Sequence, residues 1–494
     1  MPASARVFLS GAFLQMFPRA RKSGRACERE FSAGRLEIDV SIRRNQFFEG
    51  VSRRSFGMAA LGLALTVGQG ALAAPGDGLG QAEWAQKFDG DSRLAVRRST
   101  TPVLSQETVA ATEQAIERHR QLAASGGWGQ VPNQSMKVGA RGRAVVALRQ
   151  RLMASGDLDS AAGNSDVFDS YVEAGVRRFQ ARHGLGETGV VAQQTLAALN
   201  VSADYRLRQL ETNLVRLRTL AGNLGSRYVT ANIPAAMVET VENGRINSFH
   251  AAGVGKIDRQ SPVMQTRATD INFNPFWTVP ASVIRKDLIP KMQADPNYLT
   301  DNKIRIYRQD GQEISPRQVN WNSMEATNYR FRQDTGGDIN SLGFVRINIA
   351  NPYGVYMHDT PAKGIFGDDF RFVSSGCMRL QNVRDYVAFL LRDNPGWDRD
   401  KIDETIRSGA RVDVKLNNAV PVYWVYVTAW GTPDGVVQFR EDIYQRDGLG
   451  GPRPMAQAAS APAAQPQRLE PMQGGARPPA GVGGGRQAEP DDDE

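Results

Sequence analysis

Hydrophobic residues that recur with a period near 3.6 predict two long helices in the first half of the chain. Residues 105–124 begin with Ser105, a residue type that is favoured at the N-cap of a helix. Apolar residues of this segment fall near one stripe: Val109, Ile116 and Leu122. The second stripe is made of leucines, with arginines elsewhere on the helix: Leu207, Leu210, Leu214, Leu217 and Leu224. A basic amphipathic helix can lie on a membrane, but such a stripe is more often an internal packing face, so we interpret both helices as a scaffold.

A compact helical block is predicted between these helices, at residues 136–200. Its apolar residues fall on two helical faces, one with Val145, Leu148 and Leu152, the other with Val172, Val176 and Phe179. The segment "HGLGETGVV" then turns the chain, and "AQQTLAALN" closes the block. His183 in this turn is interpreted as a turn residue rather than a metal ligand.

After Gly225 the hydrophobic period changes from 3.6 to two, which predicts short strands. The pair Asn243 and Gly244 predicts a hairpin turn between the first of them. Further strand-like runs follow: "DINFNPFWTVP", "KIRIYRQDG", "LGFVRINIA", "YGVYMHD" and "ARVDVKL". The series indicates a β-rich domain of sandwich or barrel-like form. Residues 281–340 interrupt it with a helical, proline-broken segment, so we expect an inserted subdomain there.

The two ends of the chain differ in composition from its middle. The stretches "SRRSFG", "MAALGLALTV" and "GQGALAAP" have the three-part order of a secretory signal, and the paired Arg53 and Arg54 indicate the twin-arginine route. The apolar core is shorter than the about 20 residues that cross a bilayer, so we expect residues 1–74 to be removed on export. Residues 451–494 are rich in Pro, Ala, Gly and Gln and are expected to be disordered.

Removal of the leader changes the charge argument. The whole chain has 60 Lys and Arg against 52 Asp and Glu, and residues 1–74 hold 11 and 5 of these. The remainder has 49 basic and 47 acidic residues, which gives little support for nucleic-acid binding. Cys27 leaves with the leader, so Cys377 is left as a single cysteine in a compartment where cysteines usually pair.

The neighbours of Cys377 suggest a use for an unpaired thiol. In "GVYMHD" the alternation of a strand places Tyr356 and His358 on one face and the apolar Val355 and Met357 on the other. A free thiol has a pKa of about 8.5, so a nearby imidazole has to take its proton or stand beside the thiolate as imidazolium. Arg379 lies two residues after the cysteine and, in extended backbone, adds positive charge on the same side.

The small residues before the cysteine leave room for a substrate carbonyl. Ser374, Ser375 and Gly376 permit a close approach, and backbone N–H groups near Gly376 and Cys377 can point at a developing oxyanion. Downstream, "NVRDYVAFLLRDNPGW" predicts a helix that is capped by Asn382 and stops before a proline. A lone buried cysteine is nevertheless usually an inert small hydrophobe, so these residues alone leave both interpretations open.

Two segments resemble known families. The run "VGARGRAVVALRQRLMASGDL…YVEAGVRRFQARHGLGETGVVAQQTLAALN" resembles the three-helix peptidoglycan-binding domain. The run "YGVYMHDTPAKGIFGDDFRFVSSGCMRLQN" resembles the catalytic signature of the L,D-transpeptidase (YkuD-type) family, a His followed by Ser-x-Gly-Cys-x-Arg. "FNPFWTVP" and "VPVYWVYVTAW…GVVQFREDIYQRD" extend this likeness to the large, multidomain subgroup, over roughly residues 226–446.

The resemblance implies an α+β multidomain protein with a β-rich, sandwich-like catalytic domain, an inserted helical lid subdomain, a small three-helix peptidoglycan-binding domain and a helical scaffold. The expected boundaries are 100–135 and 200–225 for the scaffold, 136–200 for the peptidoglycan-binding domain, 226–415 for the catalytic domain, 281–340 for the lid, and 416–450 for a C-terminal strand extension.

The resemblance also implies roles for site residues. Cys377 attacks the carbonyl of an L-centre in a peptidoglycan tetrapeptide stem and expels the terminal D-alanine, while His358 relays the proton. The side-chain amine of a diamino acid on a neighbouring stem then resolves the thioester into a 3-3 cross-link. Gly376 supplies an oxyanion-hole N–H, Arg379 supplies positive charge, and Ser375 shapes the site. A main-chain carbonyl orients the His358 ring as in the family, because the side chain of Asp359 is expected on the opposite face.

Other residues are candidates for further roles. Trp277, Tyr353 and Tyr356 are candidates for a substrate groove, whereas Asp368 and Asp369 are expected to be a solvated pair. The sequence contains no HExxH, CxxC or phosphate-binding glycine loop, so we expect a metal-independent enzyme without a cofactor. The expected partner is peptidoglycan, in the periplasm, with no nucleic acid and no stable membrane span after signal removal. A carboxypeptidase or endopeptidase that uses water, and a catalytically silent wall anchor, stay open.

Overall fold

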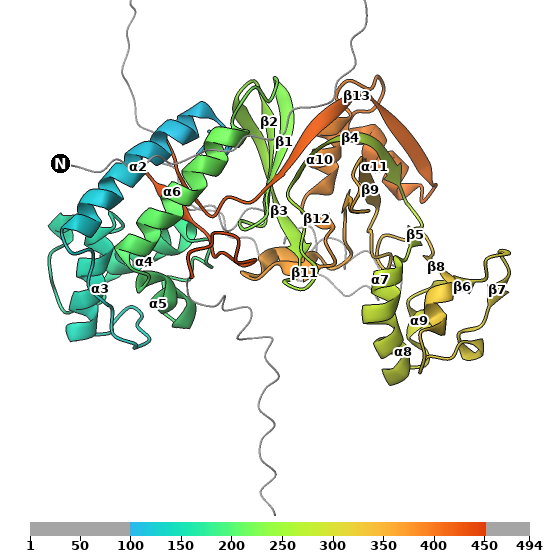
Figure 1. Cartoon of the computed structure of the whole chain (residues 1–494), viewed down its shortest axis with the longest axis horizontal. Helices are drawn as coiled ribbons and strands as arrows, with labels where there is room; N and C mark the ends of the chain where they lie inside the picture. The colour runs from blue at the N-terminus through green and yellow to red at the C-terminus, as the bar shows by residue number, and fades with distance from the viewer. Residues whose placement is uncertain (1–98, 451–494) are drawn as a thin grey trace, which may run out of the picture. The chain divides into compact units, whose positions relative to one another are not determined.

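The computed structural model describes residues 99–450 (Figure 1). The predicted leader with its twin-arginine pair, Cys27 and the predicted disordered tail lie outside the described residues. Among the described helices, none combines the length and the apolar character that a membrane crossing requires.

The described part of the chain is organised around a nine-stranded mixed sheet of order β11-β3-β12-β10-β9-β4-β13-β1-β2. Because β2 also pairs with β3, the strands from β3 round to β2 close on themselves. The bounds of these strands are β1 (Arg227–Asn232), β2 (Met237–Glu242), β3 (Arg245–Gly255), β4 (Met264–Phe273), β9 (Val345–Ile349), β10 (Met357–His358), β11 (Phe372–Ser374), β12 (Met378–Leu380) and β13 (Val412–Val425).

The predicted hairpin at Asn243 and Gly244 is confirmed. These two residues join β2 to β3 and have φ of 50° and 75°. Positive φ at both central residues is the geometry that a two-residue hairpin turn requires, and it is the reason why Asn-Gly is favoured there.

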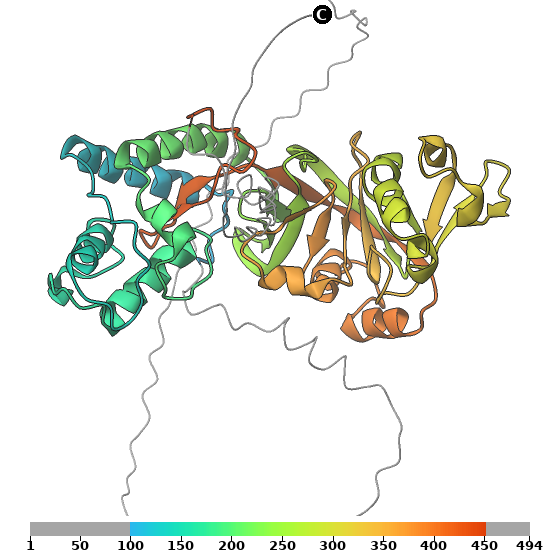
Figure 2. The same cartoon turned by 90° about the horizontal axis from the view of Figure 1, so that it is seen from below.

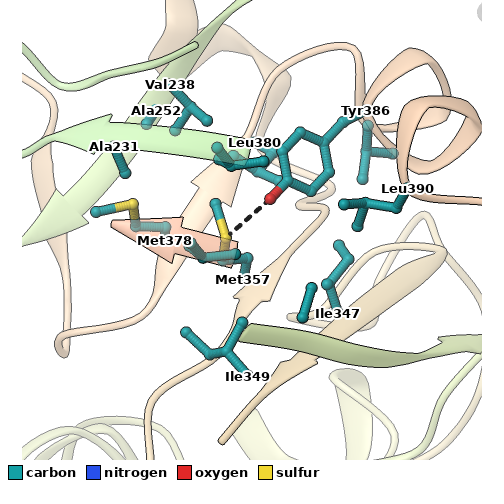
Figure 3. Packing of buried hydrophobic residues seen from close by; sticks show 14 of the residues in the cluster. Ala231, Val238, Ala252, Ile347, Ile349, Met357, Met378, Leu380, Tyr386 and Leu390 are labelled. Carbon is teal, nitrogen blue, oxygen red and sulfur yellow. Dashed lines mark hydrogen bonds between the residues drawn. The ribbon is translucent and has the colours of Figure 1, made fainter. Parts of the chain in front are cut away.

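The interior of the closed sheet is filled by apolar side chains of β3, β9, β10 and β12, and by helix α10 (Val383–Leu390). Figure 3 shows Met357, Met378, Leu380 and Tyr386 meeting in this cluster, where the Tyr386 hydroxyl contacts the sulfur of Met357 at 3.2 Å. Helix α11 (Arg399–Arg407) adds Ile402 to the cluster. This packing fixes the backbone of the strands that carry the predicted site.

The prediction that Asn382 caps α10 is wrong in its chemistry. An N-cap side chain reaches the first helical amides from an extended backbone. Asn382 instead has φ 50° and ψ 45°, which is left-handed, and its side chain does not cap the helix. The helix itself forms because Val383, Val387 and Leu390 are buried in the sheet interior.

The inserted segment is an α/β unit rather than a helical one, which corrects the prediction. Within the described residues, it holds a four-stranded sheet of order β5-β8-β6-β7 and its own apolar cluster. The elements are β5 (Trp277–Thr278), α7 (Ala281–Val283), a π-helical turn η2 (Ile284–Leu288), α8 (Ile289–Ala294), α9 (Tyr298–Asp301), β6 (Ile304–Tyr307), β7 (Glu313–Ile314) and β8 (Arg330–Gln333). The run "KIRIYRQDG" contains β6 and therefore belongs to this smaller sheet. The hydrophobic period of a strand does not indicate which of two sheets the strand joins.

The two predicted long helices are α2 (Gln106–Ala124) and α6 (Ala203–Leu220), and they lie side by side in both views (Figures 1 and 2). Ser105 caps α2 by accepting a hydrogen bond from the Thr108 N–H at 3.0 Å, as predicted. Leu210 and Leu217 of α6 are fully buried, which confirms an internal packing face, although Leu224 lies beyond the end of the helix. The stripe packs against the end of β13 and against β14 (Ala429–Gly431) and β15 (Val437–Phe439).

The predicted helical block contains α3 (Arg143–Ala154), α4 (Ser170–Arg182) and α5 (Gln193–Leu199), which surround an apolar cluster of their own. His183 ends α4 and is buried between the rings of Phe179 and Phe439. Burial and the neighbouring arginines lower its pKa well below the usual value, so this histidine is a neutral packing residue.

Candidate active site

The sheet brings Cys377 beside the strand that carries His358. β10 and β12 run parallel, with Met357 opposite Met378 and His358 opposite Arg379. The N–H of Met378 donates to the carbonyl of Tyr356 at 3.1 Å, so Cys377, one residue earlier, lies next to Tyr356. Tyr356 and Cys377 are about 20 positions apart in the chain, and they therefore lie next to each other on two paired strands.

The alternation predicted for residues 355–358 is present. Val355 and Met357 belong to the apolar cluster, while the rings of Tyr356 and His358 meet on the other face with centroids 5.6 Å apart. The predicted Tyr356 and His358 therefore face the side of the ladder on which Cys377 lies.

The His358 ring is oriented by a main-chain carbonyl. Its Nδ1 bonds to the carbonyl of Asp359, and the side chain of Asp359 turns away to accept from the Phe344 N–H at 3.0 Å and to pair with Lys363. The side chain of Asp359 therefore does not form a triad with His358 and Cys377, as the alternation of the strand predicted. With a proton on Nδ1, the other ring nitrogen, Nε2, is left as the basic one.

Both the imidazole and the thiol are neutral near pH 7. Burial lowers the pKa of His358 to about 3, helped by the charges of Arg379 and Arg346 and opposed by the Asp359 carbonyl. Burial raises the pKa of Cys377 to about 11, although Tyr356, Arg346 and Arg379 act in the opposite direction. Of the two arrangements that the sequence left open, the imidazolium beside a thiolate is therefore not the resting one, because desolvation outweighs the nearby positive charges.

Tyr356 lies between Trp277 and the thiol of Cys377 in a chain of polar contacts. The indole N–H of Trp277 donates to the Tyr356 hydroxyl at 3.2 Å, and that hydroxyl in turn hydrogen-bonds to the sulfur of Cys377. The guanidinium of Arg346 lies 4.4 Å from the centre of the Tyr356 ring. Tyr356, predicted for a substrate groove, thus contacts the predicted nucleophile itself, while Tyr353 is 59% exposed on the turn after β9.

The turn before Cys377 corrects the prediction for Gly376. Its N–H, expected to face an oxyanion, donates instead to the Ser374 hydroxyl at 3.1 Å, and that hydroxyl bonds to the carbonyl of Cys377 at 2.6 Å. Gly376 is required for another reason, since its φ of 113° is unfavourable for residues with a side chain. Its carbonyl accepts from the Ser261 hydroxyl at 2.9 Å.

Two arginines at this site were not found from the sequence. Arg346 comes from β9, and Arg259 comes from the loop between β3 and β4, where its Nη1 donates to the Ser375 hydroxyl at 2.9 Å. Nothing in their local sequence distinguishes them from surface arginines, because only the sheet order and the loop packing bring them to Cys377. The predicted solvated pair, Asp368 and Asp369, is exposed.

In the part of the chain that the structure describes, no group of three or more His, Cys, Asp or Glu side chains could hold a metal ion. Of the four histidines, His119 and His183 pack against the same ring, that of Phe439.

Comparison with known proteins gives two family matches. Residues 226–414 match the family model of the L,D-transpeptidase catalytic domain, YkuD. Residues 141–199 match that of a putative peptidoglycan binding domain. A Haemophilus influenzae protein named putative L,D-transpeptidase is 32% identical over 241 residues, which are 49% of this chain and 48% of that protein. The chain thus spans about half the length of this curated relative.

Two of the solved structures with some likeness are named L,D-transpeptidases. The Mycobacterium smegmatis enzyme is 15% identical, with 40% of this chain and 58% of that chain covered and a TM-score of 0.20. The Stackebrandtia nassauensis enzyme is 12% identical, with 62% and 98% covered and a TM-score of 0.23.

Proposed function

We propose that this chain, which carries a YkuD-type L,D-transpeptidase catalytic domain and a peptidoglycan-binding domain, is a periplasmic enzyme that forms 3-3 cross-links between peptidoglycan stems. The observation that carries the proposal is the polar cluster around Cys377, with Tyr356 at its sulfur and the oriented, neutral His358 on the same face of the ladder. The match of residues 141–199 supports peptidoglycan as the substrate.

The first half of the reaction makes a thioester. Nε2 of His358 takes the thiol proton as the sulfur of Cys377 bonds to the carbonyl carbon of the stem. The amide C–N bond then breaks, and the imidazolium gives its proton to the departing amine of the terminal D-alanine. Arg379 and Arg346 offset the negative charge that forms on sulfur and oxygen, since both already favour the thiolate.

The second half transfers the acyl group. The side-chain amine of a diamino acid on another stem attacks the thioester, His358 accepts its proton, and the sulfur leaves and is reprotonated. One amide is exchanged for another, so neither an oxidant nor a metal is required by the balance of atoms. Splitting the exchange into two steps is the benefit of a covalent intermediate.

Water competes with the acceptor amine, so the inserted segment has a role as a lid. Trp277 at its start reaches the Tyr356 hydroxyl, and Asp287 in its π-helical turn pairs with Arg259 beside Ser375. These two contacts hold the segment against the site and limit the access of water to it.

Mass spectrometry of digested sacculi after incubation with the purified chain tests the proposal. New 3-3 dimers with release of D-alanine support transfer. Tripeptides without dimers indicate that water is the acceptor, and unchanged sacculi indicate a silent wall anchor. Dimers formed by a Cys377→Ala variant would refute the thioester mechanism.

A further inference from the structure

A charged contact joins the inserted segment to the loop beside the predicted nucleophile. The two Nη atoms of Arg259 lie 2.5 and 3.2 Å from the two carboxylate oxygens of Asp287. A second, more exposed pair joins Lys286 to Asp258 at 3.4 Å. Asp287 belongs to the π-helical turn η2, a feature that is frequent at functional sites.

Arg259 is held against the turn that precedes Cys377. Its Nη1 also donates to the Ser375 hydroxyl at 2.9 Å. The carbonyl of Gln260 lies 3.4 Å from the position that a Cβ on Gly376 would take. Since Ser375 is two residues before the cysteine, their Cα atoms are at most about 7.6 Å apart. The guanidinium is therefore fixed close to the backbone of the nucleophile turn.

One donor of Arg259, its buried Nε, has an ion-pair partner in Asp258 but no hydrogen bond within the described residues. The side chain of Arg259 is 12% exposed, and the Asp258 oxygen beside Nε is 3.6 Å away. The planar guanidinium fork is suited to a carboxylate, and Asp287 already fills two of its positions in the way a carboxylate ligand would.

We propose that Arg259 is the receptor for a carboxylate of the stem peptide, and that Asp287 occupies this receptor when no substrate is bound. The inference rests on the proposed function for its substrate class. The stem has the same chemical group as Asp287, so the two compete for one guanidinium. Binding of the stem then releases the contact between the inserted segment and the nucleophile turn, which couples substrate recognition to opening of the lid.

Stems with one carboxylate converted to an amide test the receptor. The full chain is assayed with three substrates: a free tetrapeptide stem, the same stem with its terminal carboxylate amidated, and the same stem with an internal carboxylate amidated. We expect one of the two amides, which identifies the recognised group, to lower kcat/KM about tenfold to a hundredfold, as loss of a charged hydrogen bond does. Arg259→Ala removes the difference between acid and amide, and Arg259→Lys keeps part of it.

Variants of the lid contact separate recognition from closure. Asp287→Asn lowers KM for the free stem because the competing carboxylate is gone. Lys286→Ala is the matched control, since it breaks the neighbouring pair without freeing Arg259, and it keeps the wild-type ratio between acid and amide. If Arg259→Ala lowers kcat/KM by the same factor for the acid and for the amides, the proposal is overturned and Arg259 is a lid contact only.

Binding to a Cys377→Ala variant, measured by calorimetry, keeps this result independent of turnover. If the wild-type chain releases no D-alanine, the proposed function fails. In that case, the receptor is still supported if the chain binds the free stem more tightly than its amides and Arg259→Ala removes this preference. Equal binding of the acid and the amides, or no binding of the free stem, refutes the receptor.

Discussion

Burial of the Cys377 thiol predicts how its alkylation rate depends on pH. The pKa is raised from 9.0 to about 11, so at neutral pH the thiolate fraction is about one hundredth of that of an exposed thiol. Only the thiolate reacts with iodoacetamide. The alkylation rate should therefore rise about tenfold per pH unit from pH 6 to pH 10 and level off only near pH 11. Mass spectrometry of the peptide that contains Cys377 measures this rate.

The free peptide "VSSGCMRLQN" is the matched control, because it has the same neighbours without the burial. Its rate should level off near pH 8.5 to 9. Partial burial of Cys377 slows alkylation by a factor that does not depend on pH while the fold holds, so the slope and the plateau of the rate are diagnostic. A rate that is already level between pH 5 and pH 8 would mean a thiolate–imidazolium pair and would refute the neutral resting site.

Further outcomes follow from single side chains. Tyr356→Phe removes a hydrogen bond that lowers the pKa of Cys377, so the pH profile of alkylation should move to higher pH. In the D-alanine release assay, kcat should fall by up to about tenfold. An unchanged alkylation profile would contradict this role of the hydroxyl. Burial raises the pKa of Glu239 from 4.5 to about 7, so the folded state holds this proton more tightly than the unfolded chain. The free energy of unfolding should therefore fall by up to about 3 kcal/mol between pH 4.5 and pH 7, and urea unfolding of Glu239→Gln, whose side chain does not titrate, should lack this component. Gly376→Ala places a side chain at φ 113° with its Cβ 3.3 Å from Val355, so it should lower the free energy of unfolding by about 1–2 kcal/mol and reduce kcat, and wild-type values would contradict the strain argument.

Local patterns were sufficient where one contact decides the outcome. Ser105 caps its helix, Asn243 and Gly244 form the hairpin, and the alternation at residues 355–358 separates the buried Met357 from His358. Each of these depends on a few neighbouring residues, whose preferences the tertiary structure did not oppose.

Tertiary context explains what the sequence did not predict. The left-handed backbone at Asn382 and the engagement of the Gly376 N–H by Ser374 depend on how the chain is held at both ends of β12. The ionisation of Cys377 depends on burial, which outweighs two arginines from other segments. Arg259 is more than 100 residues from the cysteine in the chain, so no local motif includes it.

The neutral thiol and the closed contact at Arg259 have a common physical consequence. The proposed function assigns a single nucleophilic cysteine to an oxidising compartment, and oxidation requires both a thiolate and access to the sulfur. Partial burial of the Cys377 thiol raises its pKa and so lowers the thiolate population. The same burial opposes attack on the substrate, so it has to be relieved when a stem arrives. A receptor that exchanges Asp287 for a substrate carboxylate supplies that relief only when the substrate is present.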